Sequence, residues 1–196
     1  MQKSQFHERP LEARSLSILS PEVLNGKEKI MPRLQYLLIV LVALAGIAAV
    51  PIPAGWRAPM PKELNQEWRK DKPHHFWAIK ADFNGDGIED EAKLLVKQKG
   101  RGAALFAFVS QGKSYKTYLL DEPDEVGWLE VMGIDVVEKG KYETACGKGY
   151  VDCKPGEPEQ ITLKNPGIDY FKEGSANSFF YWDDKKRAFN RIWISD

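Results

Sequence analysis

Residues 81–91 read A-D-F-N-G-D-G-I-E-D-E, and both the fold and the chemistry of the chain are most directly inferred from this stretch. Oxygen-bearing side chains stand at positions 1, 3, 5 and 9 counted from Asp82, and a glycine stands at position 6. Loops that wrap Ca²⁺ place their side-chain ligands at such alternate positions and add the backbone carbonyl of position 7. The stretch therefore predicts a structural Ca²⁺ site with these ligands: the side chains of Asp82, Asn84, Asp86 and Asp90 and the carbonyl of Ile88.

The same stretch also fits a metal-free hairpin turn, because Asn-Gly and Asp-Gly are strong turn signals by themselves. An EF-hand is excluded, since Lys93 stands at position 12, where an EF-hand has a bidentate Glu. The residues that follow, 91–97, have the pattern of a strand and not of a helix. The metal loop and the plain turn both remain open, and each of them joins two strands.

Short apolar or alternating segments, separated by turn residues, fill the chain from Phe76 onwards. The expected strands cover residues 76–80, 91–96, 103–109, 115–120, 128–137, 160–163, 179–182 and 189–194. Strands at such short spacing, with no long helical period between them, predict a mainly β domain over residues 76–196, built as an antiparallel sheet or a small β-sandwich. Residues 55–75 are expected to form a linker and one short helix, over 61–72.

Residues 81–96, followed by the apolar segments 104–109 and 115–120, resemble one unit of the FG-GAP/VCBS type. Repeats of this type occur in integrin-like propellers and in many secreted bacterial proteins, and they hold Ca²⁺ in a D-x-N-x-D-G-x-x-D loop between strands. The sequence contains no second copy, and a propeller needs several blades, so the propeller and its adhesive role are not implied. The chain as a whole resembles small exported bacterial proteins, which implies no activity.

The first part of the chain predicts export. Residues 1–30 are polar and mixed in charge, and we expect them to be disordered or to lie upstream of a true start at Met31. Residues 31–54 contain an apolar core over 37–50, which has the length of a signal peptide and falls short of the roughly 20 residues of a spanning helix. A cleaved signal peptide and an uncleaved membrane anchor through residues 34–52 both remain open. Either one places the rest of the chain outside the cytoplasm, in the periplasm or medium or anchored in the inner membrane.

Composition argues against nucleic acid as a partner. The chain has 28 basic and 28 acidic residues, of which six and four precede residue 55, so the remainder has 22 and 24 and no basic surplus. Cys146 and Cys153 are the two cysteines of the chain. In an oxidising compartment they predict a disulfide, because their spacing does not match a redox pair and no histidine or third cysteine stands nearby.

Catalytic motifs are absent from the sequence, which has no G-x-S-x-G elbow, phosphate-binding glycine loop or H-E-x-x-H motif. No catalytic residue is therefore predicted. The leading hypothesis is an exported, non-catalytic binding or envelope-associated domain whose partner is an unknown protein or envelope component. Two alternatives remain open. The first is an inhibitor or immunity-type protein that inserts residues 121–125 or 147–152 into an envelope enzyme, and the second is a hydrolase that uses acidic residues near the calcium loop.

Exposed aromatic and acidic side chains are the candidates for a partner surface. Alternate side chains of the strand over 179–182 point to opposite faces, so one aromatic pair is expected at the surface. The acidic turn after the strand over 115–120 is suited to a basic partner. The candidate residues are Phe180, Trp182, Asp121, Glu122, Asp124 and Glu125.

Overall fold

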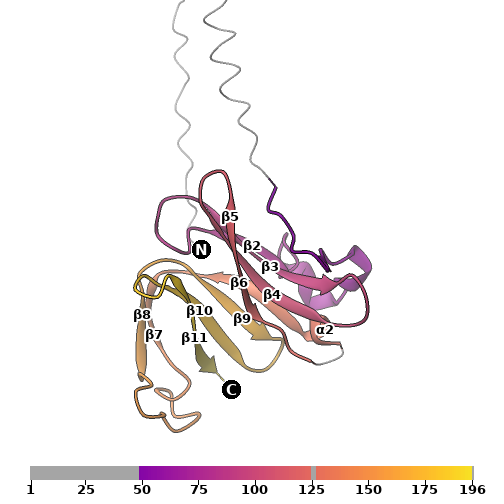
Figure 1. The fold of residues 1–196 in the computed structure, drawn as a ribbon. Helices are drawn as coiled ribbons and strands as arrows, with labels where there is room; N and C mark the ends of the chain where they lie inside the picture. Colours follow the sequence, from indigo (N-terminus) through magenta and orange to yellow (C-terminus); the bar gives the residue numbers. More distant parts are fainter. Residues whose placement is uncertain (1–48, 125–126, 196) are drawn as a thin grey trace, which may run out of the picture. The chain divides into compact units, whose positions relative to one another are not determined.

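The computed structural model of the chain describes residues 49–124 and 127–195, which contain two antiparallel sheets and one short hairpin (Figure 1). The five-stranded sheet comprises β1 (Trp56–Arg57), β2 (Ala78–Ala81), β3 (Asp90–Lys97), β4 (Ala103–Ser110) and β5 (Tyr115–Asp121). The four-stranded sheet comprises β6 (Met132–Val137), β9 (Gly167–Lys172), β10 (Asn177–Asp183) and β11 (Ala188–Ser195). The separate hairpin pairs β7 (Gly140–Glu143) with β8 (Gln160–Leu163).

Strand order brings the acidic loop to one end of the five-stranded sheet. The order is β1-β3-β4-β5, and β2 pairs with β3 on the edge that β1 also uses. The loop joins β2 to β3, where Ala81 is paired with Asp90. In the four-stranded sheet the order is β11-β10-β9-β6. These antiparallel pairings confirm the predicted mainly β fold, and within the segment 55–75, predicted as linker and helix, Trp56 and Arg57 pair with β3 as β1.

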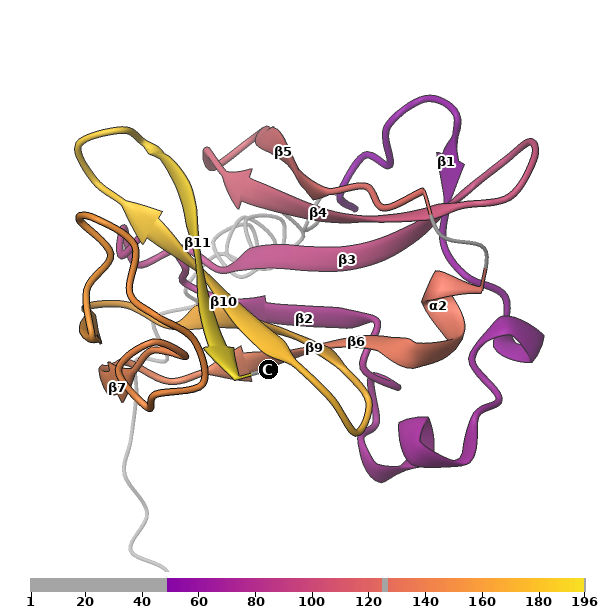
Figure 2. The same cartoon turned by 90° about the horizontal axis from the view of Figure 1, so that it is seen from below.

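The core lies between the two sheets, because alternate residues of each strand face it. Leu94 of β3 and Leu105 of β4 are paired and completely buried there. They belong to one cluster with Ile168, Tyr170 and Phe180 from the four-stranded sheet. Figure 2 shows β10 running obliquely to β3 and β4. The chain is therefore a small β-sandwich, as the sequence predicts.

The other face of the five-stranded sheet is also apolar. Leu95, Ala104 and Phe108 are completely buried on this face, and Phe106 is nearly so. The ring of Trp56 packs edge-on against Phe106, with 5.1 Å between centroids. Burial on both faces explains why β4 reads as an unbroken apolar run in the sequence instead of alternating.

Residues 61–72 do not form the single helix that was expected. They form two 3₁₀ helices, η1 (Pro61–Glu63) and η2 (Glu67–Asp71), which are separated at Leu64. Leu64 and Arg69 are both buried. In one continuous α-helix these two side chains would point about 140° apart. Burying both requires the break, so tertiary contacts override the helical period.

Arg69 is completely buried and joins distant parts of the chain. Its guanidinium donates to the carbonyls of His75 (2.9 Å), Met132 (2.6 Å) and Leu129, and its Nε donates to the side-chain oxygen of Gln66 (2.8 Å). Leu129 and Met132 lie in and just after α2 (Trp128–Val131), a one-turn helix. Arg69 therefore fastens η2 to the beginning of β6.

Two further differences from the predicted elements concern the four-stranded sheet and the separate hairpin. Residues 128–131 were expected as strand but form α2, because a segment of four residues is too short for its pattern to separate the two states. Strands β7 and β9 were not expected, although β9 places Ile168 and Tyr170 in the core with the alternation typical of a strand.

The predicted export segment lies almost entirely outside the described residues, as do residues 1–30. Neither the signal peptide over 31–54 nor the anchor over 34–52 can therefore be compared with the fold. In the part of the chain that the structure describes, no helix is long and apolar enough to span a membrane.

Candidate functional site

Asp82 organises the backbone of the acidic loop. Its Oδ1 atom accepts hydrogen bonds from the amides of Gly85 (2.7 Å) and Asp86 (3.1 Å), and its Oδ2 atom accepts one from the amide of Gly87 (2.8 Å). Gly85 and Gly87 have φ values of +75° and +83°, which residues with a Cβ rarely adopt. The loop is thus curled around one carboxylate, at which three amide dipoles point.

Asn84 and Asp86 face each other within the same loop. The Nδ2 atom of Asn84 donates to Asp86 Oδ2 (3.0 Å), and the amide of Asp86 donates to Asn84 Oδ1 (2.9 Å). The amide of Ile88 donates to Asp86 Oδ1 (2.9 Å). Carboxylate and amide oxygens can accept more than one bond, so these hydrogen bonds do not exhaust their capacity.

Asp90 points in the opposite direction, into the fold, and is completely buried. Its Oδ2 atom accepts hydrogen bonds from the amides of Phe83 (3.0 Å) and Asn84 (3.3 Å), and its Oδ1 atom accepts one from the amide of Ser110 (2.8 Å). Burial raises the pKa of Asp90 to about 6, although the three amides partly oppose this shift. Asp90 therefore anchors the acidic loop to the end of β4.

This geometry divides the predicted calcium ligands into two groups. Asp82, Asn84 and Asp86 lie together in the loop, and their oxygens are of the hard type that Ca²⁺ prefers. Asp90 is the completely buried member, and its two oxygens bind backbone amides on the inner side, whereas Asp82, which also accepts three amides, is only half-buried. Within residues 49–124 and 127–195, no group of three or more His, Cys, Asp or Glu side chains is arranged to hold a metal ion.

A contact with the β8–β9 turn holds the acidic loop from outside. The Nδ2 atom of Asn165 donates to the Phe83 carbonyl (3.4 Å). A Cβ atom at Gly85 would lie 2.6 Å from the Asn165 amide group, so a larger residue here would displace this side chain, and the φ value independently favours glycine. The loop therefore contacts both sheets of the sandwich.

A hollow of about 540 Å³ lies beside the acidic loop. Its lining comes from the loop, from β5 and from the β10–β11 hairpin, and includes Asn84, Asp86, Lys116, Tyr118, Trp182 and Arg187. Trp182, which the sequence predicts for a partner surface, thus lines the same hollow as the predicted metal ligands Asn84 and Asp86. The hollow joins two candidate features that the sequence places about a hundred residues apart.

Aromatic side chains form a rigid part of this hollow. Tyr118 and Trp182 are half-buried and meet edge to face, with 5.7 Å between ring centroids. Phe189 packs against both, at 5.6 and 5.3 Å. The Tyr118 hydroxyl donates to the carbonyl of Arg187 (2.9 Å), which fixes the hairpin over β5. Local sequence gives no signal for Tyr118, Lys116 and Arg187, because only the packing of β5 near the β10–β11 hairpin makes them neighbours of Trp182.

The other residues predicted for a partner surface have different roles. Phe180 is 4% exposed and packs in the central core, so its assignment to the surface is wrong. Asp121 accepts a hydrogen bond from the Tyr170 hydroxyl (2.8 Å), and Glu122 pairs with Lys97 (2.8 Å). Asp124 is exposed. Glu125 lies outside the described residues.

The predicted disulfide joins Cys146 to Cys153, with 4.9 Å between their Cα atoms. It closes a loop between β7 and β8 that presents Tyr150 and Val151, 57% and 48% exposed. Backbone hydrogen bonds brace this loop, among them Tyr150 amide to Ala145 carbonyl (3.0 Å). The disulfide-closed loop, residues 146–153, is therefore a braced turn with an exposed aromatic side chain.

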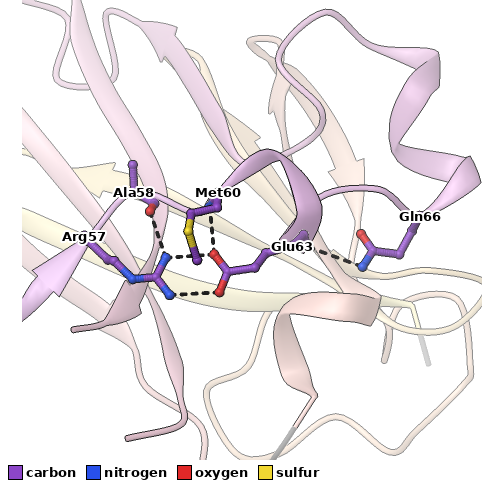
Figure 3. Close-up of polar contacts among 5 residues, drawn as sticks. All are labelled: Arg57, Ala58, Met60, Glu63 and Gln66. Carbon is purple, nitrogen blue, oxygen red and sulfur yellow. Dashed lines mark hydrogen bonds and ion pairs between the residues drawn. The ribbon is translucent and has the colours of Figure 1, made fainter. Parts of the chain in front are cut away.

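A separate hollow of about 760 Å³ lies near β1, η1 and α2. Figure 3 shows its central contact, in which the Arg57 guanidinium donates to both carboxylate oxygens of Glu63, at 2.7 and 2.8 Å. The Met60 amide donates to the same carboxylate (2.7 Å). The Arg57 hydrogen bonds lower the pKa of Glu63 to about 2. Arg57 and Glu63 therefore satisfy each other's charge on the wall of this hollow.

Comparison of the chain with protein-family models, with curated proteins and with solved structures gives no match.

Proposed function

We propose that this chain is an exported, non-catalytic binding protein whose ligand site is the hollow beside the acidic loop. The observation that supports this proposal best is the position of Trp182. It combines with Tyr118 to provide preformed aromatic surface, and the polar side chains of Asn84 and Asp86 stand next to it. A concave site with aromatic surface and a few fixed polar groups is typical of ligand binding.

Two features of the fold support the proposed location and mode of action. The Cys146–Cys153 disulfide is typical of oxidising compartments outside the cytoplasm. The hydrolase hypothesis requires two carboxylates in a pocket near the loop, whereas Asp86 is the one carboxylate among the described residues that line the hollow. Binding without catalysis is therefore the better-supported function.

Calcium is the second part of the proposal. Asp82, Asn84, Asp86 and the Ile88 carbonyl would hold the ion, and Asp90 would support them from inside by fixing the amides of Phe83 and Asn84. A bound Ca²⁺ ion would neutralise the carboxylates and stiffen the wall of the hollow. Extracellular calcium modules commonly bind at about 10⁻⁴ to 10⁻³ M, which suits a structural ion.

Thermal unfolding of the full chain with and without Ca²⁺ tests this part. An ion that binds only the folded state stabilises it by about 2.7 kcal/mol at one hundred times its Kd. We expect the unfolding midpoint to rise with Ca²⁺ in the native chain and in Asp124→Asn, whose exposed carboxylate lies outside the loop. The rise should vanish in the double variant Asp82→Asn/Asp86→Asn. Equal curves with calcium and with chelator in the native chain would reduce the loop to a hairpin turn.

Cosedimentation with insoluble cell-envelope material tests the binding site. The full chain should sediment with the material, and Trp182→Ala should lose most of this binding. Trp193→Ala is the matched control, because Trp193 is 47% exposed on β11 and does not line the hollow. If the two tryptophan variants bind alike, the ligand site lies elsewhere on the protein.

A second candidate function, inhibition of an envelope enzyme, is favoured by the disulfide-closed loop. Its bracing keeps Tyr150 exposed at little entropic cost, and aromatic side chains on rigid supports are typical of binding hot spots. Tyr150→Ala separates the two functions. Its loss of a tight protein partner from envelope extract, with cosedimentation unchanged, would assign the loop to inhibition. If Tyr150→Ala retains every partner, this candidate is excluded.

A further inference from the structure

The hollow beside the acidic loop has a basic side that the function proposed above does not use. Lys116 and Arg187 line it, and both are exposed. Neither side chain forms an ion pair or donates a side-chain hydrogen bond to any other described residue, although the ammonium of Lys116 lies 4.7 Å above the ring of Tyr118. By contrast, two cations close to Arg187 in the sequence are paired: Lys186 with Asp183 and Arg191 with Asp121.

Arg187 stands at a position that favours another residue. Its φ is +50°, in the left-handed region where glycine or asparagine fits with less strain. The backbone of Arg187 serves the fold, since its carbonyl accepts the Tyr118 hydroxyl, but its side chain forms no ion pair, hydrogen bond or cation–π contact with another described residue. The guanidinium is exposed and has no ion-pair partner among the described residues, so it is available to a ligand.

The neighbouring polar groups and the aromatic surface indicate the rest of that ligand. Ser110 and Gln111 add a hydroxyl and an amide beside Asn84, and such groups suit the hydroxyls of a polar ligand. Tyr118 and Trp182 suit the C–H face of a saturated ring. Trp182 also lines a second hollow, of about 430 Å³, so a ligand can extend beyond one ring.

We propose that the hollow binds a saccharide that carries carboxylates, with its carboxylate at Lys116 and Arg187 and a sugar ring at Tyr118 and Trp182. The planar guanidinium matches the geometry of a carboxylate, and the ammonium adds a second positive charge. The hollow has a volume of about 540 Å³, within the range of small-ligand sites. This inference rests on the proposed binding function and specifies the class of its ligand.

Calorimetric titration of the full chain tests it with three probes: a trigalacturonate, a neutral galactose trisaccharide and a glutamate-rich hexapeptide. The trigalacturonate should bind, and each of Arg187→Gly and Lys116→Gln should weaken it by about tenfold, the order expected for one lost charge-assisted hydrogen bond. Lys113→Gln is the matched control, because Lys113 is exposed in the β4–β5 turn and does not line the hollow. Arg187→Gly should also raise the unfolding midpoint, since glycine relieves the left-handed strain.

The outcomes separate the ligand class from the binding function. Equal binding of the neutral trisaccharide would overturn the role of the carboxylate, and binding of the hexapeptide alone would show that the hollow takes an acidic protein segment. A fall in both affinity and midpoint in Arg187→Gly would assign Arg187 to the fold and overturn the inference. If the chain sediments with envelope material through Trp182 but ignores trigalacturonate, the ligand class is wrong and the binding function stands.

Discussion

Arg69 and Asp90 are charges of opposite sign that the fold treats in the same way. Both are completely buried, and neither has an oppositely charged partner among the described residues. Backbone groups replace water around each: carbonyl oxygens surround the Arg69 guanidinium, and three amides surround the Asp90 carboxylate. A buried charge without a counter-ion is tolerated when fixed dipoles satisfy its hydrogen bonds.

The two sites differ in what they connect and in how they titrate. Arg69 joins segments about sixty residues apart, whereas Asp90 holds a loop to the neighbouring strand β4. Burial lowers the pKa of Arg69 to about 10, so it stays charged at every physiological pH. Burial raises the pKa of Asp90 to about 6, close to neutrality. Arg69 therefore keeps its charge and its contacts at every physiological pH, whereas the charge of Asp90 changes with pH near neutrality.

Replacing Arg69 should have the largest effect. Arg69→Met keeps much of the apolar stem but leaves several buried carbonyls without a donor, at about 1–3 kcal/mol each before relaxation. We expect a loss of about 4 kcal/mol in the free energy of unfolding, measured by urea titration. Lys70→Met is the control, because Lys70 is exposed and should change stability by less than about 0.5 kcal/mol. A loss below about 1 kcal/mol in Arg69→Met would mean that water replaces the guanidinium.

Replacing Asp90 should cost less. Asp90→Ala removes the acceptor for three amides, but the Asn84 amide lies near the half-buried part of the loop, where water can reach it. We expect a loss of about 3 kcal/mol and faster hydrogen exchange at the amides of Phe83 and Ser110. Glu89→Ala changes an exposed neighbouring acid and should leave both amides protected. Unchanged exchange at Ser110 in Asp90→Ala would show that Asp90 does not fasten the loop to β4.

These two residues also mark the limits of prediction from the sequence. The acidic spacing marks Asp90 as a site residue, and apolar or alternating segments correctly indicate β3, β4, β5, β10 and β11. The pattern does not show that the Asp90 side chain turns inward. Its direction depends on a hydrogen bond from the amide of Ser110, twenty residues further along the chain. Arg69 has no local signal at all. Its role depends on carbonyls of Leu129 and Met132 that only the folded chain brings near.

The candidate site shows the same division. Trp182 and the acidic loop were both recognised from local sequence, one as an aromatic strand residue and the other as a ligand pattern. Their common hollow was not, since it forms where Tyr118 of β5 meets the β10–β11 hairpin of the other sheet. Phe180 was assigned to the surface for the same reason, because alternation shows which residues share a face but not which face another sheet covers.

Replacing Asp169 should have the smallest effect on stability, and it tests a buried carboxylate whose surroundings differ from those of Asp90. It lies opposite Asp135 in the β6–β9 pairing and accepts one hydrogen bond, from Asn177 (2.9 Å). Burial, and to a smaller degree the charge of Asp135, raise the pKa of Asp169 from 3.8 to about 6. A raised pKa means that the folded state holds the proton more tightly than the unfolded state does. The contribution of Asp169 to stability is therefore fully present below about pH 4 and is lost as the pH rises through about 6.

We accordingly expect Asp169→Asn to stabilise the protein at pH 7.5 and to flatten the fall in stability between pH 4 and 6. A shift of this size corresponds to about 3 kcal/mol, and partial exposure of Asp169 reduces the expected change to about 2 kcal/mol. Urea titrations at pH 4, 5, 6 and 7.5 measure it, with the exposed Asp184→Asn as control. Because burial also raises the pKa of Asp90 to about 6, part of the fall in stability with rising pH should remain in both variants. An unchanged pH profile in Asp169→Asn would leave Asp90, held by amides alone, as the group whose titration shapes that profile.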